Sequence, residues 1–245
     1  MIPLNEIFNT VLYQPLFNTL VLLNEYLPGH DFGMSVIILT ILIKILFYPL
    51  GIKAIRSQKI LTDLQPKIKE IQEKHKEDKE KQTKAIMELY QKEKINPFSG
   101  CLPILIQLPI LIALYQVFWK GFQPEQMINL YHFVSKPEAI NPIFLGLVNL
   151  SQPNVLFSLL AGISQFFQSK MLNPKQDKSK SKQPSQRKDQ MFRLSGMMQK
   201  QMQYLFPIFT VLIVWKLPSA IALYWIVTTL FSIVQQHFIL KKSPV

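Results

Sequence analysis

One lysine of this sequence stands out because it lies inside a long apolar segment. Residues 34–50 (MSVIILTILIKILFYPL) contain Lys44 near their middle and neither Asp nor Glu. An ammonium group at the centre of a membrane-spanning helix costs about 2.5 to 3.5 kcal/mol on insertion scales. Lys44 is therefore expected to face a polar cavity and to attract an acidic group that enters from outside the chain. The alternative is structural: carbonyl groups and waters satisfy Lys44, and the lysine only holds helices together.

Other polar side chains lie in the apolar segments, but none of them forms a pattern typical of an enzyme. Thr40 precedes Lys44 by four residues, which places both on one face of a helix and lets them line one groove. Gln107 is a better candidate for a hydrogen bond between helices than for a ligand contact. The sequence has no Gly-x-Ser-x-Gly motif, no phosphate-binding loop and no acidic pair in its apolar segments. One cysteine and four scattered histidines predict no metal site, so we expect no catalytic residue and no cofactor.

The apolar residues around these side chains gather in blocks that suit a membrane. Hydrophobic residues make up 49% of the chain, and its net charge is +12. A helix needs about 20 apolar residues to cross about 30 Å of hydrocarbon. Residues 202–240 carry a single charge, Lys216, and are too long for one crossing, which predicts a hairpin of two helices. The predicted spans are residues 34–54, 101–120, 155–170, 202–216 and 218–240.

The remaining segments are predicted to lie outside the hydrocarbon. Residues 1–33 include a stretch, 7–27, in which Asn and Gln residues interrupt the apolar ones; we expect an interfacial amphipathic helix there, with a sixth span as the alternative. Residues 55–97 are strongly charged, yet their apolar residues recur at helical spacing and predict a helical hairpin. The other segments are a loop at 121–154, a basic loop at 171–200 and a short basic tail at 241–245.

The positive charges predict the orientation of the spans. Of the 27 Lys and Arg residues, all except Lys44, Lys120, Lys136 and Lys216 lie in residues 53–94, in residues 170–200 or in the C-terminal tail. Because Lys and Arg concentrate in cytoplasmic loops, these segments are predicted to be cytoplasmic and the N-terminus to be outside. That orientation requires an odd number of spans, and five spans satisfy it. The sequence thus predicts an all-α integral protein of the cell membrane.

Four segments resemble the YidC/Oxa/Alb family of membrane protein insertases. They are LYQPLFNTL at 12–20, LQPKIKEIQEK at 64–74, KINPFSGCLPILIQLPILIALYQVF at 94–118 and LPSAIALYWIVTTLFSIVQQ at 217–236. The resemblance implies five transmembrane helices around a hydrophilic groove, with an N-terminal interfacial helix and a cytoplasmic helical hairpin. In the family, this groove opens to the cytoplasm and to the lipid and is closed on the outer side.

The resemblance also implies roles for four residues. In the family, a cation on the first span of the bundle attracts acidic residues in the outer segment of the substrate. Lys44 matches the position of this cation, where the family usually has arginine. Thr40, Gln165 and Trp225 match positions that line the groove, with Gln168 as an alternative to Gln165.

The implied function is the insertion and assisted folding of integral membrane proteins, without covalent catalysis. The implied partners are nascent membrane proteins and the lipid bilayer; the ribosome, through the cytoplasmic loops, and a Sec translocon are further candidates. A transporter of small solutes or ions, with Lys44 at the substrate site, is the alternative function. It predicts paired broken spans or an internal repeat, and the sequence shows neither. A purely structural subunit of a membrane complex would leave a lysine in the middle of a span unexplained.

Overall fold

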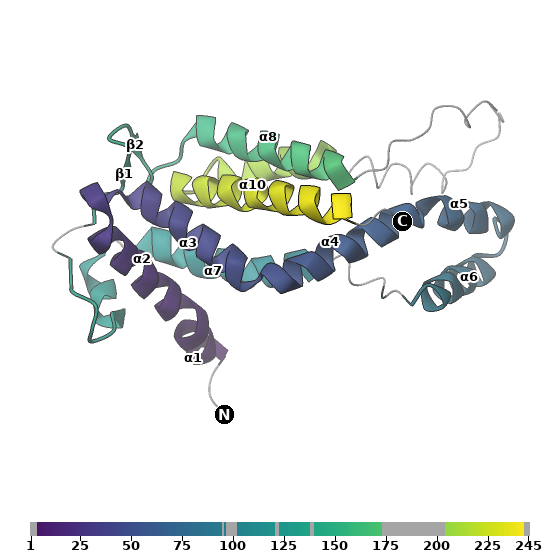
Figure 1. Cartoon of the computed structure of the whole chain (residues 1–245), viewed down its shortest axis with the longest axis horizontal. Helices are drawn as coiled ribbons and strands as arrows, with labels where there is room; N and C mark the ends of the chain where they lie inside the picture. The colour runs from purple at the N-terminus through teal and green to yellow at the C-terminus, as the bar shows by residue number, and fades with distance from the viewer. Residues whose placement is uncertain are drawn as a thin grey trace.

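The computed structural model describes residues 4–94, 96, 102–120, 123–137, 140–172 and 204–242, and most of these residues are helical. Figure 1 shows long helices packed into a bundle, from which a hairpin of two helices projects. The N-terminal elements are α1 Leu4–Phe8, the π-helix η1 Asn9–Tyr13, α2 Gln14–Tyr26 and the 3-10 turn η2 Pro28–His30. They are followed by α3 Phe32–Leu46, α4 Tyr48–Asp63, α5 Gln65–Lys74, α6 Lys79–Lys92, α7 Leu102–Lys120, η4 Pro124–Asn129, β1 Ile143–Phe144, β2 Val148–Asn149, α8 Val155–Leu172, a helix at Tyr204–Val214 and α10 Ser219–Lys242.

The helix that carries Lys44 ends in a sharp bend. α3 starts after Asp31, whose carboxylate accepts a hydrogen bond from the backbone N–H of Met34 at 2.9 Å. α4 follows α3 after Phe47, at an angle of 70°. Pro49 lies in the first turn of α4, where its missing N–H and its ring interrupt a continuous helix. The segment predicted as one span, 34–54, is therefore divided at Phe47.

The described helices differ in how well their length suits a membrane. The stretch Ser219–Lys241 of α10 is long and apolar enough to cross a membrane alone, and α3 with α4 meets the same standard as a bent pair. Two further helices, Leu105–Trp119 and Tyr204–Val214, are apolar but shorter. Within the described residues, one or two crossings are thus supported by length and composition, and five spans stay a prediction. Most of the basic loop predicted at 171–200, and the end of the predicted tail, lie outside the described residues.

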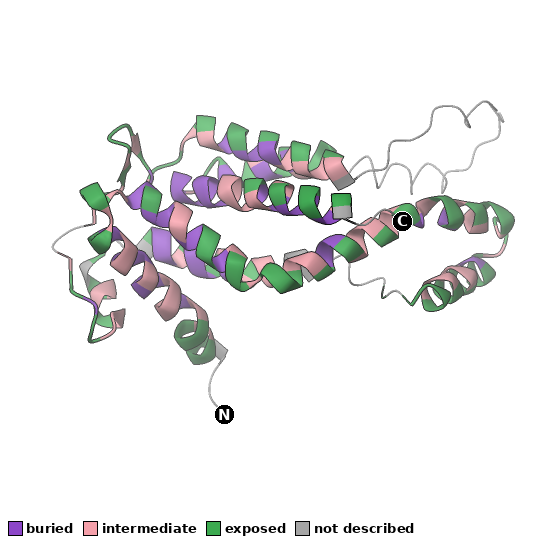
Figure 2. Cartoon of the chain, viewed as in Figure 1, coloured by how far each residue is buried: buried purple, intermediate pink, exposed green. Residues whose placement is uncertain are grey.

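A continuous apolar core joins α2, α3, α7 and α10. Each helix contributes large side chains that are almost fully buried, among them Phe17, Val36, Phe118 and Tyr224. Figure 2 shows buried residues where these helices face one another and exposed residues on the outer faces of the bundle and on the projecting hairpin. Because lipid tails are as apolar as these side chains, close packing rather than transfer from water holds such helices together in a membrane.

The N-terminal helix α2 packs on the bundle through polar as well as apolar contacts. The side chain of Asn18 donates a hydrogen bond to the carbonyl of Asn129 at 3.0 Å and accepts one from the backbone N–H of Tyr131 at 2.7 Å. The hydroxyl of Tyr13, at the end of η1 just before α2, donates to the side chain of Gln126 at 2.8 Å. These bonds tie the N-terminal helix to the loop after α7, and its place at the membrane interface stays a prediction.

A short β-hairpin closes one end of the bundle. β1 and β2 pair in antiparallel fashion, with Phe144 opposite Val148. The loop after β2 then receives hydrogen bonds from the start of α10: Ser219 N–H donates to the carbonyl of Gln152 at 2.9 Å, and Ala220 N–H donates to that of Leu150 at 3.0 Å. The first N–H groups of a helix have no partner within the helix, so these bonds fix the loop and the helix to each other.

The helix Tyr204–Val214 approaches α8 closely at Gly162. A Cβ atom added at Gly162 would lie 2.3 Å from Cγ2 of Val211 and 3.2 Å from the carbonyl oxygen of Pro207. Small residues permit such approaches between membrane helices. Gly162→Ala is therefore expected to lower the unfolding temperature of the purified protein in detergent micelles by several degrees.

A second substitution provides the control for this contact. Val211→Ala removes the methyl group that the new side chain would strike, so the double variant should regain most of the lost thermal stability. A double variant as unstable as Gly162→Ala alone would show that the contact with Val211 does not set the distance between the two helices.

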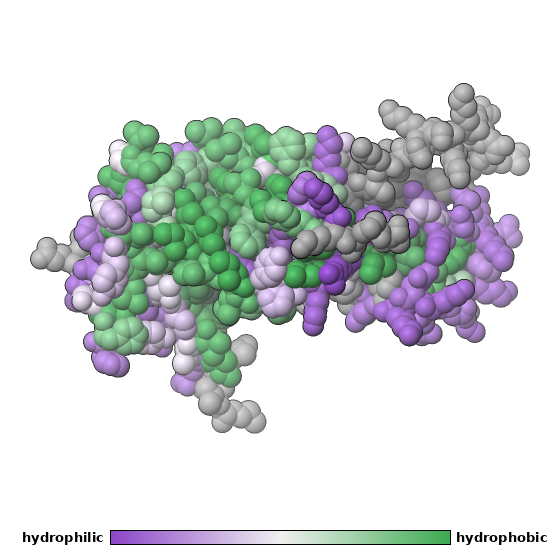
Figure 3. All heavy atoms as spheres, in the orientation of Figure 1, coloured by the Kyte–Doolittle hydropathy of each residue, from purple (hydrophilic) through white to green (hydrophobic). Residues whose placement is uncertain are grey.

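α5 and α6 form the charged hairpin that projects from the bundle (Figure 1). Ile68 of α5 is buried, and the amide of Gln82 on α6 donates to the carbonyl of Gln72 on α5 at 3.1 Å. At the base of the hairpin, Nζ of Lys67 lies 2.7 Å from the carboxylate of Glu93, and this hydrogen-bonded cation holds the pKa of Glu93 below its ordinary value. Figure 3 shows that the surface of the hairpin is hydrophilic whereas much of the bundle surface is apolar, as expected for water beside lipid.

Candidate functional site

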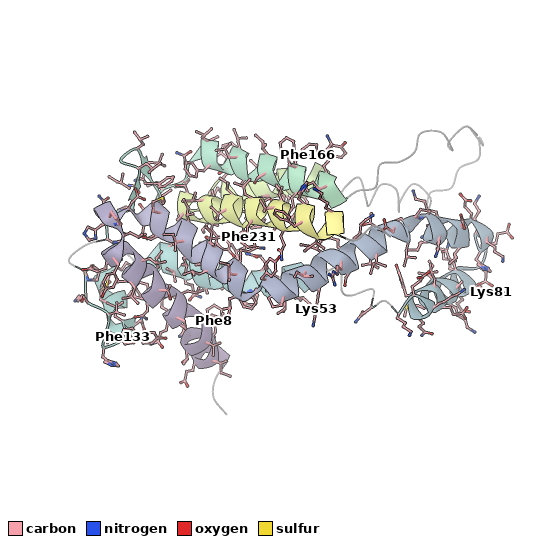
Figure 4. The ribbon with its side chains drawn as sticks, in the orientation of Figure 1. Phe8, Lys53, Lys81, Phe133, Phe166 and Phe231 are labelled. Carbon is pink, nitrogen blue, oxygen red and sulfur yellow. The ribbon has the colours of Figure 1, made fainter. Side chains whose placement is uncertain are left out.

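Lys44 reaches from α3 to α10. Its Nζ atom donates a hydrogen bond to Oγ of Ser232 at 2.9 Å and lies 5.6 Å from the ring centroid of Phe231, within cation–π range. Ser232 donates in turn to the backbone carbonyl of Thr228 at 2.9 Å, which leaves its oxygen free to accept from the lysine. Figure 4 shows Phe231 on α10, beside α3. Among the described residues, no carboxylate lies within salt-bridge distance of Lys44.

A small cavity lies next to Lys44, at the bend between α3 and α4. It has a volume of about 80 Å³, which is enough for a few water molecules. Gln107 from α7 and Tyr224 and Gln235 from α10 give it a polar wall, and the other lining residues apart from Lys44 are apolar or glycine. An ammonium group has three donors, and Ser232 takes one of them. The remaining donors of Lys44 can therefore serve a water molecule or an incoming acceptor.

Two amide side chains hold the polar wall in place. Nε2 of Gln235 donates to the carbonyl of Tyr48 at 3.2 Å, just after the bend. Gly51 leaves room for this amide, since a Cβ atom there would lie 2.9 Å from the same nitrogen. Nε2 of Gln107 donates to the hydroxyl of Tyr224 and so connects α7 to α10. This bond agrees with the interpretation of Gln107 as a contact between helices.

Gln165 and Trp225 form a second polar contact, between α8 and α10. Nε1 of Trp225 donates to Oε1 of Gln165 at 3.0 Å, and Nε2 of Gln165 donates to the side chain of Gln168 at 3.2 Å. Of the two glutamines considered from the sequence, Gln165 is thus the one hydrogen-bonded to Trp225. Trp225 and Ser232 are seven residues apart, so they lie on the same side of α10, about 10 Å from each other along the helix.

Thr40 does not line the cavity beside Lys44. Its side chain is 1% exposed, and its hydroxyl donates to the carbonyl of Val36 at 2.6 Å within the same helix. Helical spacing thus brings Thr40 one turn from Lys44, but the hydroxyl proton of Thr40 is already donated to Val36. A role for Thr40 in a groove stays a prediction and would require the bundle to open at this level.

Ser232 and Gln235 are the site residues that the sequence analysis missed. Both contact α3 or the start of α4, at Lys44 and Tyr48 respectively. They continue a polar stripe on α10 that begins at Trp225 and Thr228, with steps of three and four residues. Such a stripe on an otherwise apolar helix indicates a face turned toward polar surroundings. This spacing is the feature of the sequence from which Ser232 and Gln235 could have been predicted.

The groups around Lys44 can hold and orient a polar group. A cation, two amides and a phenol supply donors suited to a carboxylate or a carbonyl oxygen, whereas the hydroxyl proton of Ser232 is already donated to Thr228. Within the described residues, no group of three or more His, Cys, Asp and Glu residues is placed to hold a metal ion. The arrangement is suited to contact a hydrogen-bond acceptor, with Lys44 as its charged element.

A helical bundle whose outer faces are largely apolar is the fold of a membrane protein. The family model described as "60Kd inner membrane protein" matches residues 23–244 of the chain. The chain belongs to this family. The resemblance to the YidC/Oxa/Alb insertases is thereby confirmed.

Individual relatives bear the name "Membrane protein insertase YidC". The chain is 38% identical to that of Magnetococcus marinus, over 94% of this chain and 36% of the relative. It is 35% identical to that of Geobacter metallireducens, over 95% of this chain and 37% of the relative. The Fusobacterium nucleatum relative is 34% identical, over 87% of this chain and 88% of its own length. The chain thus spans little more than a third of two of these relatives and most of the third.

A solved structure shares the fold. It is described as an active YidC insertase crystal structure with the first transmembrane domain resolved, and the comparison gives a TM-score of 0.55 at 24% sequence identity. The match covers 93% of this chain and 45% of the other. The fold of the bundle is thus that of a YidC structure, while the number of spans and the shape of a groove stay predictions.

Proposed function

We propose that the chain inserts integral membrane proteins into the bilayer and assists their folding. The observation that carries the proposal is Lys44, a cation with no carboxylate partner among the described residues, beside a cavity with a polar wall. In this mechanism, acidic residues in the outer segment of a substrate are drawn to Lys44, and the apolar helix of the substrate then moves into lipid. The names of the relatives support the same function.

The proposal includes the groove and its residues. Lys44, Thr40, Gln165 and Trp225 are proposed to line a hydrophilic groove that five spans surround, with the segment boundaries predicted from the sequence. Two of the four, Gln165 and Trp225, are hydrogen-bonded to each other. Lys44 is hydrogen-bonded to Ser232, which lies on the same side of α10 as Trp225. A polar path from Trp225 to Gln235 along α10 supports a groove that follows this helix.

The attraction between Lys44 and a substrate must be transient. A carboxylate and an ammonium group 4 Å apart attract each other by about 4 kcal/mol at an effective dielectric constant of 20. A fully buried ion pair would trap the substrate, whereas a hydrated contact to a single ammonium group releases it. Burial of about 20 apolar residues of the substrate in lipid then provides the driving force for the final step. The cavity beside Lys44 would supply that hydration.

The proposed partners follow from the same mechanism and from the surface charges. Nascent membrane proteins are the substrates and the lipid bilayer is the destination. The hairpin of α5 and α6 carries many lysines, and such surfaces bind phosphate backbones without sequence preference. Ribosomal RNA near this hairpin would bring the nascent chain to the groove, and a Sec translocon is a further proposed partner.

Reconstitution into lipid vesicles tests the function. A substrate with one transmembrane helix and an acidic outer tail is synthesised in the presence of vesicles with and without the protein, and protection of the tail from added protease measures insertion. We expect protected tail only in vesicles that contain the protein. Flux of small solutes is measured in the same vesicles. Solute flux without insertion would contradict the proposal and favour a transporter.

The proposed orientation gives a separate prediction. With the N-terminus outside and the C-terminus inside, the turn between α5 and α6 lies in the cytoplasm and the loop after β2 lies outside. A membrane-impermeant maleimide added to intact cells should therefore label Gln152→Cys and leave His75→Cys unlabelled, each in a Cys101→Ser background that removes the single native cysteine. Labelling of His75→Cys from outside would overturn the orientation.

A further inference from the structure

The turn of the β-hairpin is built from residues that a solvent-exposed turn rarely uses. Leu145, Gly146 and Leu147 connect β1 to β2; the first two have φ angles of 50° and 70°, and Leu147 N–H donates to the carbonyl of Phe144 at 3.0 Å. Two successive residues with positive φ are a feature of type I′ turns, in which Asn-Gly and Asp-Gly are preferred. A leucine in the left-handed region is strained, and such strain persists only where the surroundings impose it.

The surroundings fix this turn firmly. One carboxylate oxygen of Asp31 accepts a hydrogen bond from the N–H of Leu145 at 2.6 Å, while the other accepts from Met34 at the start of α3. The ring of Phe144 packs on Gly33, where a Cβ atom would lie 2.0 Å from the ring, and it meets the ring of Phe157 on α8 edge to face at 6.4 Å. The hairpin is therefore a rigid projection of the bundle.

The tip of this projection is apolar and exposed. Leu145 is 62% exposed and Leu147 is 85% exposed. Residues 140–154 contain no charged side chain. Figure 3 shows apolar atoms over the region that Figure 1 labels β1 and β2, continuous with those over α8. The neighbouring start of α8 adds Val155 and Leu156, which are also more than half exposed.

We propose that the tip formed by Leu145 and Leu147 inserts into the lipid of the adjacent leaflet and anchors this end of the bundle in the membrane. A patch without charges that continues the apolar face of a membrane helix suits acyl chains better than it suits a protein partner, whose interfaces carry a polar rim. Asparagine would suit the left-handed position of Leu145 better than leucine does. Contact with lipid therefore explains why a leucine is found there. The proposal depends on the membrane location of the family and not on the proposed insertase function.

The consequence is a fixed depth for the end of the bundle. Asp31 and Phe144 connect the lipid-embedded tip to the starts of α3 and α8, and Ser219 and Ala220 connect the same loop to the start of α10. A tip anchored in lipid therefore sets the level at which these three helices begin. Helices that are short for a bilayer depend on such flanking anchors for their position.

Depth-dependent fluorescence quenching tests the anchor. A nitrobenzoxadiazole probe is attached to Leu147→Cys in a Cys101→Ser background, in phosphatidylcholine vesicles that contain a lipid spin-labelled near the upper end of the acyl chain. Leu159→Cys, on the exposed apolar face of α8, and Lys84→Cys, on the charged hairpin, are the lipid and water references. We expect the probe at position 147 to be quenched by the spin label like the lipid reference and to be shielded from aqueous iodide. Quenching by iodide equal to that of the water reference would overturn the anchor, as would protection from both quenchers, which indicates a protein cover.

A second variant separates the anchor from the turn. Leu145→Asn suits the left-handed conformation, so the protein should unfold in detergent at the same or a higher temperature. The same variant removes apolar surface from the tip, and spin-label quenching of the probe at position 147 should fall at least twofold. Unchanged quenching would show that Leu145 does not hold the tip in lipid, and the proposed anchor would be wrong.

Discussion

Replacing Lys44 by alanine is expected to reduce insertion of a substrate with an acidic outer tail at least about tenfold, which corresponds to about 1.4 kcal/mol. The attraction between a carboxylate and a hydrated ammonium group accounts for this magnitude after part of it is offset by desolvation. Lys44→Glu should reduce insertion further, because it repels the same tail. Lys44→Arg should retain insertion, since it keeps the charge on a side chain of similar reach.

The substrate provides the matched control for this prediction. A tail in which every acidic residue is replaced by its amide should insert to nearly the same extent with all four residues at position 44. The insertion efficiency of both tails is measured across Lys44→Ala, Lys44→Glu and Lys44→Arg in reconstituted vesicles. A uniform loss for both tails would show that the substitution damages the bundle rather than the attraction.

Ser232 offers a second control, within the protein. Ser232→Ala removes the hydroxyl that accepts from Nζ of Lys44 at 2.9 Å but leaves the charge in place. If charge carries the effect, Ser232→Ala should insert the acidic-tailed substrate within about threefold of the parent. A hydrogen bond to a charged group contributes about 1.5 to 3 kcal/mol, and water in the adjoining cavity can replace much of it.

Should Lys44→Ala insert the acidic-tailed substrate as well as the parent does, Lys44 has only the structural role of joining α3 to α10.

The helices of the bundle were predictable from the sequence, but the bend beside Lys44 was not. A proline inside an apolar segment does not by itself predict a break, as α7 shows by continuing through Pro109. At Phe47, two residues before Pro49, the helix turns by 70°. The amide of Gln235, far away in the sequence, is hydrogen-bonded to the carbonyl of Tyr48 beside this bend. Whether a proline bends a membrane helix thus depends on which neighbouring groups satisfy the freed backbone.

The residues of the candidate site were likewise only partly predictable from the sequence. Lys44 could be found because a charge within an apolar segment is conspicuous in any sequence. Its partner Ser232 could not, because the pairing depends on how α3 and α10 are rotated against each other, and helical periodicity within one segment says nothing of that rotation. Thr40 shares a helix face with Lys44 by local spacing, and its hydrogen bond to Val36 lies within the same helix, but its burial follows from packing with other helices.

Deleting the hairpin of α5 and α6 is expected to abolish most insertion while the bundle still folds. The two helices project from the bundle (Figure 1), and α5 packs mainly on α6 and on the end of α4. Little packing is therefore lost when residues 65–92 are replaced by a short Gly-Ser linker between Leu64 and Glu93. The unfolding temperature of the shortened protein in detergent should stay within a few degrees of the parent, and its insertion of a single-span substrate should fall at least about tenfold, or about 1.4 kcal/mol.

A variant with both helices in place distinguishes the presence of the hairpin from its attachment. Lys67→Ala with Glu93→Ala removes the ion pair at the base, whose partners are 57% and 34% exposed. Exposed ion pairs contribute about 0 to 1 kcal/mol, so this double variant should insert substrate nearly as well as the parent. A loss equal to that of the deletion would mean that the angle of the hairpin, rather than its charged surface, is required. If the shortened protein fails to assemble in membranes at all, the hairpin is part of the folding unit, and its proposed role in receiving the nascent chain loses its support.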